Sequence, residues 1–260
     1  MRKLVFLVTL VAALAVASPA QAIIHGDPDG NRHPYVGMTF NDDFVCSGTL
    51  IAPKVFLTAG HCSDFLRVPS QGQGWVTFQE DGTAFPEDHK VAAAYTAPGF
   101  CNDDAFTVPD CPGQGVLGFV QNDVGVVILA DAVSMSGYGR LPGPNVVSQL
   151  PMMTPVTPVG YGIRVRLNKY HGEAFQRFFT HSNLIQSQQP WSSLFYKISS
   201  NFGQNRGATC FGDSGGPDFL RSSRTILGVH SFVNNLNCAG WSGSARVDTP
   251  AMLAWIRSFM

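Results

Sequence analysis

The sequence predicts an all-β protein built from many short strands. Its 260 residues include 27 glycines and 17 prolines, and only 13% of them are charged. Apolar or alternating runs, such as those at 55–57, 75–78 and 226–229, are separated by Gly, Pro, Asn and Asp. Short strands with turn signals between them are typical of a barrel or sandwich rather than a helical bundle.

The N-terminus predicts a secretory signal peptide over residues 1–22. Arg2 and Lys3 precede an apolar stretch at 4–16, and the segment ends in Ala20-Gln21-Ala22. A basic start, a short apolar core and a small-residue end are the features of a cleaved export signal. The apolar run is short for a membrane span of about 20 residues. We therefore expect a secreted protein, extracellular or periplasmic, with cleavage after Ala20 or after Ala22.

The C-terminus predicts an amphipathic helix over about 248–259. Asp248 or Thr249 could cap this helix, with Pro250 in its first turn. The apolar residues that recur at helical spacing are Met252, Leu253, Trp255, Ile256 and Phe259.

The most informative segment is Gly-Asp-Ser-Gly-Gly-Pro at 212–217. Ser214 is a candidate nucleophile, and a serine needs a base that a third group orients. The glycines allow a tight turn that can point backbone amides at a reacting carbonyl oxygen. Asp213 is a carboxylate beside the nucleophile, and a buried carboxylate needs a cationic partner.

Two segments upstream supply the base and its partner. His61 ends an apolar run in Leu-Thr-Ala-Gly-His-Cys at 57–62. Asp123 opens the apolar run Val-Gly-Val-Val-Ile-Leu at 124–129, where a buried charge needs hydrogen bonds.

With these residues in the order His61, Asp123, Ser214, the chain resembles the chymotrypsin-like (trypsin-fold) serine proteases. The resemblance covers residue 23 to about 258. Its motifs are Ile-Ile-His-Gly at 23–26, Thr-Ala-Gly-His-Cys at 58–62, Asn-Asp-Val-Gly-Val at 122–126, Val-Gly-Tyr-Gly at 159–162, the hexapeptide, and Gly-Val-His-Ser-Phe at 228–232.

The resemblance implies one protease domain over 23–260 with two six-stranded antiparallel β-barrels and a C-terminal α-helix. The barrels are expected at about 23–130 and 150–246, and residues 134–151 are expected to cross between them. The implied activity is that of a serine-type endopeptidase, a hydrolase that acts in the cleft between the barrels.

The resemblance also assigns catalytic roles. His61 is expected to take the Ser214 hydroxyl proton, and Asp123 to hold the imidazole in the required tautomer. The backbone N–H groups of Gly212 and Ser214 are expected to form the oxyanion hole. Ser231 matches the serine that hydrogen-bonds the triad aspartate.

The implied substrate pocket contains Ala208 at its floor and Ser231-Phe232-Val233 along one wall. Ala208 stands where an acidic residue would select Lys or Arg, and Val233 stands where glycine would leave the pocket open. We therefore expect cleavage after small or medium apolar residues.

In the family, the aspartate before the nucleophile pairs with a newly exposed α-amino group. Here the implied pair is Asp213 with Ile23. Signal cleavage after Ala22 would itself expose Ile23, whereas cleavage after Ala20 would leave a blocking Gln21-Ala22 stub. His25 departs from the family pattern, which often has glycine there.

Six cysteines in a secreted chain permit fifteen pairings. The resemblance selects Cys46–Cys62 and Cys210–Cys238, and Cys101 and Cys111 remain as a third pair. The segment around the third pair is acidic, but its spacing matches no specific Ca²⁺ motif, so we expect a solvated loop there. We expect no metal and no cofactor.

The charge balance argues against two classes of partner. The formal net charge is −1, and residues 1–22 contain two of the 17 basic and none of the 18 acidic residues. This gives no reason to expect nucleic acid, or a membrane after signal cleavage, as a partner. The expected partner is a protein or peptide substrate, and the expected state is a monomer.

Three alternatives remain. Gly212-x-Ser214-x-Gly216 also fits the nucleophile turn of α/β-hydrolases, but those enzymes place the histidine well after the serine, and only His230 follows here. A non-catalytic binding protein on the same fold and an esterase are the other two. Asp218, directly after the hexapeptide, stands where an apolar residue is more usual, and the sequence offers no reason for it.

Overall fold

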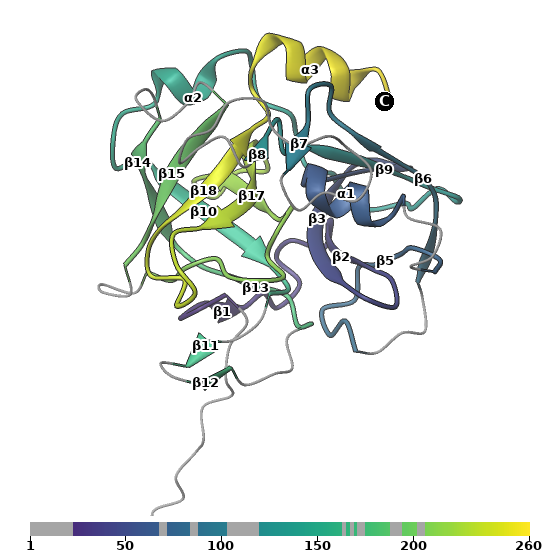
Figure 1. The fold of residues 1–260 in the computed structure, drawn as a ribbon, viewed down its shortest axis with the longest axis horizontal. Helices are drawn as coiled ribbons and strands as arrows, with labels where there is room; N and C mark the ends of the chain where they lie inside the picture. Colours follow the sequence, from purple (N-terminus) through teal and green to yellow (C-terminus); the bar gives the residue numbers. More distant parts are fainter. Residues whose placement is uncertain are drawn as a thin grey trace, which may run out of the picture.

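The computed structural model describes residues 23–67, 72–83, 88–102, 120–162, 165–166, 169–170, 175–187, 194–201 and 206–260. The predicted signal peptide and Cys111 lie outside these residues. The described chain forms two groups of antiparallel strands side by side, with a helix at one end of the molecule (Figure 1). This arrangement confirms the predicted all-β fold with two barrels.

The first barrel is a closed ring of six strands. Its strands, in spatial order, are β2 (Val36–Phe40), β3 (Val45–Ala52), β4 (Val55–Thr58), β9 (Gly125–Leu129), β6 (His89–Thr96) and β5 (Trp75–Thr77). The apolar strand β4 pairs with β9 along its whole length, with Thr58 opposite Gly125. Because Asp123 lies just before β9, this register brings it to the end of β4, where His61 follows.

The second barrel also contains six strands and is closed by the pairing of β10 with β16. Its strands, in spatial order, are β10 (Pro155–Gly160), β14 (Ser182–Gln186), β15 (Phe195–Ser200), β18 (Gly240–Arg246), β17 (Ile226–Val233) and β16 (Pro217–Leu220). Two short strands extend this sheet, β13 (Phe178–Phe179) and β1 (Asp27–Pro28). The N-terminal segment therefore crosses to the second barrel, and the strands of the first barrel begin at β2.

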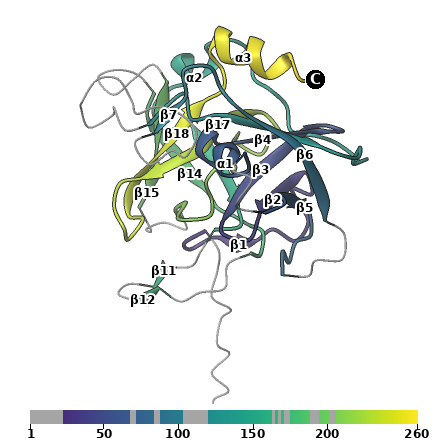
Figure 2. The same ribbon diagram turned by 45° about the vertical axis from the view of Figure 1, so that its right-hand side comes forward.

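The remaining elements are short. They are the pair β7 (Cys101–Asn102) and β8 (Val120–Gln121), the pair β11 (Val165–Arg166) and β12 (Lys169–Tyr170), and the helices α1 (Gly60–Phe65), α2 (Val146–Gln149) and α3 (Pro250–Arg257). Figure 2 shows α1 beside β3, between the two groups of strands. The described helices include none that is long and apolar enough to cross a membrane.

Helix α3 confirms the predicted terminal helix. Of the two candidate caps, Thr249 is the one that accepts a hydrogen bond from the Met252 amide, and Pro250 opens the helix. Asp248 instead accepts from the Val147 amide at 2.7 Å and pairs with Arg246. Asp248 therefore fixes α2 rather than α3.

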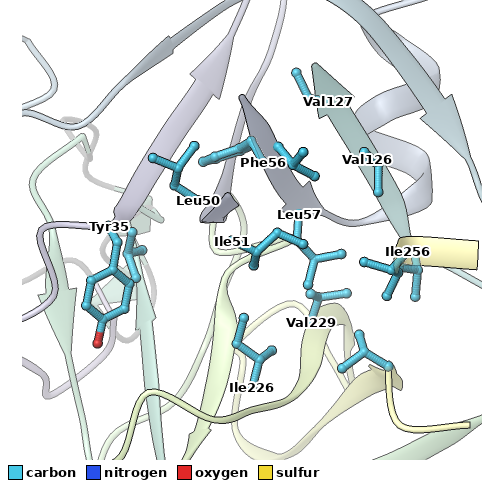
Figure 3. Packing of buried hydrophobic residues seen from close by; sticks show 14 of the residues in the cluster. Tyr35, Leu50, Ile51, Phe56, Leu57, Val126, Val127, Ile226, Val229 and Ile256 are labelled. Carbon is cyan, nitrogen blue, oxygen red and sulfur yellow. The ribbon is translucent and has the colours of Figure 1, made fainter. Parts of the chain in front are cut away.

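One apolar core spans both barrels. Leu50, Phe56 and Val126 from the first barrel are fully buried in the same cluster as Val229 from the second and Ile256 from α3 (Figure 3). This shared core holds the two barrels together, so residues from both can form one site.

Candidate active site

His61 lies where the first barrel meets helix α1. Strand β4 ends at Thr58, and α1 begins at Gly60, so His61 is in the first turn of the helix. A disulfide between Cys46 and Cys62 ties this turn to β3. A side chain on Gly60 would crowd Phe100 and Asp123, so glycine allows the turn to lie against the carboxylate.

The Asp123 carboxylate is fully buried and faces His61. Its Oδ1 accepts from the His61 backbone amide at 2.8 Å, and its Oδ2 lies 2.9 Å from His61 Nδ1. Ser231 Oγ, from the second barrel, donates to the same Oδ2. The carboxylate therefore orients the imidazole, with Nδ1 directed inward.

The electrostatics of this pair favour charge separation. Burial raises the pKa of Asp123, but the His61 charge and hydrogen bonds, together with Ser231, outweigh burial and hold it below its usual value. Burial lowers the pKa of His61, but the Asp123 carboxylate outweighs that effect and raises it above its usual value. The pair therefore stabilises an imidazolium, which is what a general base becomes after accepting a proton.

The turn that carries Ser214 packs against the same part of the first barrel. The Ser47 amide donates to the Ser214 carbonyl at 2.8 Å, and the Cys62 sulfur lies 3.7 Å from that carbonyl oxygen. Gly215 has a φ of +80°, and a side chain there would meet Thr58. Glycine therefore lets the turn approach the end of β4, three residues before His61.

The Ser214 hydroxyl and His61 Nε2 form no hydrogen bond with each other or with any other residue that the structure describes. Both residues are partly exposed to solvent. Catalytic hydrogen bonds are often long in a ligand-free site and tighten when substrate binds.

The backbone amides of Gly212 and Ser214 are the predicted oxyanion-hole donors. Neither N–H donates a hydrogen bond within the described part of the chain. Gly212 has a φ of +89°, and its carbonyl accepts from Ser47 Oγ at 2.9 Å. This hydrogen bond ties the turn before Ser214 to the first barrel.

Asp213 is fully buried behind this turn. It accepts from the amides of Gly162 and Cys210, each at 2.8 Å. Burial raises its pKa to about 7, although the two hydrogen bonds act in the opposite direction. No side-chain cation among the described residues pairs with it. A side chain on Gly160 would overlap the carboxyl group, so its cavity is tight.

The segment that starts at Ile23 lies close to the predicted pocket floor. Ile24 and Ala208 exchange two backbone hydrogen bonds of 2.9 Å, and Ile23 is buried against Phe178. Ile23 and His25 have φ values of 47° and 56°. Left-handed backbone is unfavourable for a β-branched residue such as isoleucine.

Comparison with known proteins identifies the family. The sequence model of the trypsin family matches residues 23–256. The chain belongs to the trypsin family. It is therefore a serine-type endopeptidase, a hydrolase whose substrates are proteins or peptides.

Individual relatives of this trypsin-family chain are distant. Brachyurin from Leptuca pugilator is 25% identical over 237 residues, which cover 88% of this chain and 93% of brachyurin. The solved structure of HL collagenase has a TM-score of 0.66 at 20% identity, covering 91% of this chain and 98% of that one. The structure of human heparin binding protein has a TM-score of 0.64 at 18% identity, covering 91% and 96%. These structural likenesses support the trypsin fold.

Only part of the predicted pocket of this trypsin-family protein forms one cluster. Ala208 and Val233 pack together around the disulfide between Cys210 and Cys238. Phe232 packs against other rings, with centroids 5.3 Å from Phe195 and 5.9 Å from Trp241. Ser231 turns to Asp123 instead. Cys101 is buried, and its predicted partner Cys111 lies outside the described residues.

Cys46, His61 and Cys62 bring potential metal-binding atoms within 4.8 Å of one another. The two sulfurs are bonded to each other, and His61 Nδ1 faces Asp123. This cluster is therefore a disulfide beside the candidate triad.

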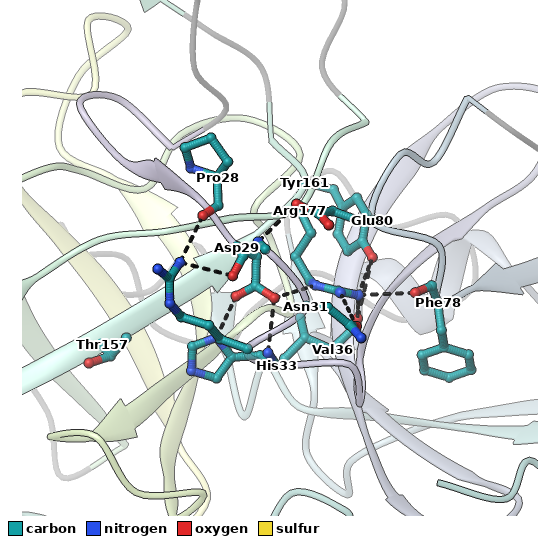
Figure 4. Close-up of polar contacts among 12 residues, drawn as sticks. Pro28, Asp29, Asn31, His33, Val36, Phe78, Glu80, Thr157, Tyr161 and Arg177 are labelled. Carbon is teal, nitrogen blue, oxygen red and sulfur yellow. Dashed lines mark hydrogen bonds and ion pairs between the residues drawn. The ribbon is translucent and has the colours of Figure 1, made fainter. Parts of the chain in front are cut away.

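Sequence reasoning missed a buried network around Arg177 (Figure 4). Its guanidinium group donates to Asp29 at 2.9 Å, to the Tyr161 hydroxyl at 3.0 Å and to Asn31 at 3.1 Å. The Asp29 carboxylate also lies 2.5 Å from His33 Nδ1. The network anchors the N-terminal segment beside the end of β10. That strand leads to Gly162, whose amide donates to Asp213. Asp29 and Arg177 are 148 residues apart, so no local pattern signals their pairing.

Ser47 is a second missed residue. Its hydroxyl donates to the Gly212 carbonyl and accepts from the Tyr161 amide, each at 2.9 Å. It therefore connects the first barrel to both sides of the Asp213 cavity. The local sequence Cys-Ser-Gly at 46–48 does not indicate this role, because the partners of Ser47 lie more than 100 residues away.

Proposed function

We propose that this protein is a secreted endopeptidase that cleaves peptide bonds with His61, Asp123 and Ser214 through an acyl-enzyme. The observation that carries the proposal is the buried Asp123 carboxylate, which binds both the backbone and Nδ1 of His61. This arrangement leaves Nε2 on the side of the ring away from Asp123, in a side chain that is partly exposed to solvent. The Ser214 turn is the nucleophile-bearing segment that packs beside it.

Acylation begins when substrate enters the cleft and the Ser214 hydroxyl meets His61 Nε2. His61 takes the hydroxyl proton as Oγ attacks the carbonyl carbon, and Asp123 stabilises the resulting imidazolium. The free amides of Gly212 and Ser214 receive the oxyanion, and each such donor contributes on the order of 3 kcal/mol to transition-state binding. His61 then gives its proton to the leaving amine. Water repeats the sequence to release the acid.

An active-site-directed fluorophosphonate probe tests the triad. We expect processed protein to be labelled stoichiometrically, and expect the Ser214→Ala and His61→Ala variants to remain unlabelled at equal folding. Labelling that survives in Ser214→Ala would contradict the assignment. A processed protein that never reacts would instead be a binding module. Paired peptide and ester substrates with the same acyl group separate an endopeptidase from an esterase.

We propose a preference for small or medium apolar side chains on the acyl side of the cleaved bond. Ala208 and Val233 are apolar and pack together beside the disulfide between Cys210 and Cys238, and Ala208 takes the place of the acidic residue that would select Lys or Arg. A peptide-library profile dominated by Lys or Arg would contradict this preference.

We propose that Asp213 becomes paired when cleavage before Ile23 creates an α-amino group. The carboxyl is buried, and none of the described side chains supplies it with a cation. Ile24, next to Ile23, exchanges backbone hydrogen bonds with Ala208, two residues before the Cys210 amide that donates to Asp213. The left-handed conformations of Ile23 and His25 belong to the uncut chain, and cleavage would remove the constraint on Ile23. N-terminal sequencing of secreted, active protein should give Ile23; a stable mature start at Gln21 would contradict activation by signal cleavage alone.

The two described disulfides support an oxidising, extracytoplasmic location. We propose that the mature protein is a monomer there, which light scattering of the secreted protein would test. A dimer at micromolar concentration would contradict this.

A further inference from the structure

Asp218 occupies a strand position inside the second barrel and is fully buried. Its Oδ2 accepts from the Tyr196 hydroxyl at 2.8 Å and from Ser244 Oγ at 2.6 Å. Its Oδ1 makes no hydrogen bond within the described residues and lies 3.5 Å from His230 Nδ1. The unusual acid after the hexapeptide therefore belongs to a polar cluster in the barrel interior.

This cluster is built by strand register. His230 on β17 lies opposite Ser244 on β18, and Ser244 lies opposite Tyr196 on β15. The three side chains therefore form a row across adjacent strands, and Asp218 on β16 meets the row from the other side of β17. Four strands of the barrel contribute to one buried cluster.

His230 is also joined to the turn that carries Ser214. Its backbone carbonyl accepts from the Gly215 amide at 2.8 Å, and its amide donates to the Gly216 carbonyl at 2.9 Å. A side chain on Gly216 would press on the His230 ring. The next residue, Ser231, donates to Asp123. The His230 ring thus lies directly beneath the candidate nucleophile turn and next to the triad.

We propose that Asp218 and His230 form a buried carboxylate–imidazole pair that positions the Ser214 turn, and that protonation of His230 loosens this turn. The pair acts through the backbone of the turn and touches no substrate, so both members are positioning residues. The inference rests on the proposed function, because the position of the turn matters for the reaction only if Ser214 is the nucleophile.

The protonation effect follows from the surroundings of the ring. Two titratable groups lie near the His230 ring: Asp218 on β16 and, beyond Ser244, Tyr196 on β15. Ser244 on β18 contributes a hydroxyl group, and the glycines of the Ser214 turn contribute no side chain. Neither ring nitrogen has a hydrogen bond within the described residues. An imidazolium could direct Nδ1–H at Asp218, but its Nε2–H would remain buried without an acceptor, which is unfavourable.

Burial lowers the pKa of His230, and the Asp218 charge opposes this only in part. A histidine whose pKa is depressed by folding destabilises the folded state as pH falls below its ordinary value. The pKa of His61 is shifted in the opposite direction. The two ionisations should therefore be separated, with His61 titrating first as the pH falls.

The experiment is a pH profile of the fluorophosphonate labelling rate, with thermal melting as the folding check. In the processed wild-type protein, we expect the logarithm of the labelling rate, plotted against pH, to fall with slope 1 on acidification as His61 is protonated. Once His230 is protonated as well, the slope should become 2. His230→Gln keeps a donor near Asp218 but cannot titrate, so it should retain slope 1 throughout. Asp218→Asn removes the charge that raises the His230 pKa, so its second break should move to lower pH.

Ser182→Ala is the matched control. Ser182 is buried in the same barrel and donates to the Ser199 carbonyl at 2.6 Å, and no hydrogen bond among the described residues joins its side chain to the Ser214 turn. It should lower the melting temperature without changing the slopes. A wild-type protein that reacts with a single slope, or a His230→Gln variant that keeps two, would overturn the proposal. A wild-type protein that does not react at all contradicts the proposed function instead.

A second measurement needs no core substitution. In the Ser214→Ala protein, which keeps the pair intact, NMR can follow each imidazole C2 proton against pH. The His230 signal should titrate at the second break of the wild-type rate profile. A His230 ring that does not titrate there overturns the proposal, even if both core variants fail to fold.

Discussion

Two buried carboxylates near the candidate active site, one beside each barrel, differ in their partners. Asp123, beside the first barrel, has both oxygens hydrogen-bonded, to His61 and to Ser231. Asp213, in the second barrel, has two amide donors and no cation among the described residues. Because a buried charge is stable only when it is paired, the Asp123 site is electrostatically complete, whereas no cation in the described part of the chain completes the Asp213 site.

The largest expected effect comes from breaking the complete site. Asp123→Asn should lower kcat by about 10⁴-fold with little change in KM, because the amide no longer holds His61 in the productive tautomer. The measurement is steady-state hydrolysis of a peptide with a small apolar residue at the cleaved bond.

Ser231→Ala is the control for this change, since it removes one hydrogen bond to Asp123 and leaves the charge. It should lower kcat by roughly tenfold to a hundredfold. If Asp123→Asn is no more harmful than Ser231→Ala, Asp123 does not orient the base.

The second prediction is that Asp213→Asn changes the stability of the processed protein and of the uncut chain in opposite directions. In processed protein, Asp213→Asn leaves the Ile23 ammonium buried without a partner and should destabilise by about 3–5 kcal/mol. In the uncut chain, the same substitution removes an unpaired buried carboxyl and should stabilise. Urea unfolding of both forms on the Ser214→Ala background measures this. Equal effects in the two forms would show that cleavage supplies no partner to Asp213.

The uncut chain should also respond to pH in a characteristic way. With a folded pKa of about 7 and an ordinary value of 3.8, folded Asp213 binds a proton that the unfolded chain has lost. The difference in stability between the uncut chain and its Asp213→Asn variant isolates this group from His230, whose titration acts with the opposite sign. That difference should fall as pH rises from about 4 to about 7, by about 4 kcal/mol in all, and stay level above. The processed form should lack this fall, since its carboxylate is paired. A difference between the uncut chain and its Asp213→Asn variant that stays flat between pH 4 and 7 would contradict the burial of an unpaired carboxyl.

The comparison also explains what the sequence could predict. His61, Asp123 and Ser214 lie in short continuous motifs at strand ends, so they were identifiable along with the barrel fold. Helix α1 was not predicted, because it is six residues long and has no capping side chain. The pair of Asp218 and His230 depends on how β16 and β17 align, and a bulge shifts that register beside Asp218. Register and bulges are set by the assembled sheet, so a lone strand does not reveal them.

The smallest expected effect concerns specificity in the second barrel. Val233→Gly should open the pocket beside Ala208 and shift preference to larger apolar side chains, because it removes side-chain volume without adding charge. A change of this kind is worth about 1–3 kcal/mol, so the ratio of kcat/KM values for a large and a small apolar residue should rise by roughly tenfold to a hundredfold. Ser182→Ala removes a buried hydrogen bond to Ser199 and not a side chain of the predicted pocket, so it should leave that ratio unchanged. No hydrogen bond among the described residues joins Val233 to Asp123 or Asp213. The rate of labelling by a small fluorophosphonate should therefore be the same in Val233→Gly as in the wild-type protein. A loss of labelling would mean that Val233 supports the Ser214 turn, and an unchanged ratio would mean that it does not line the pocket.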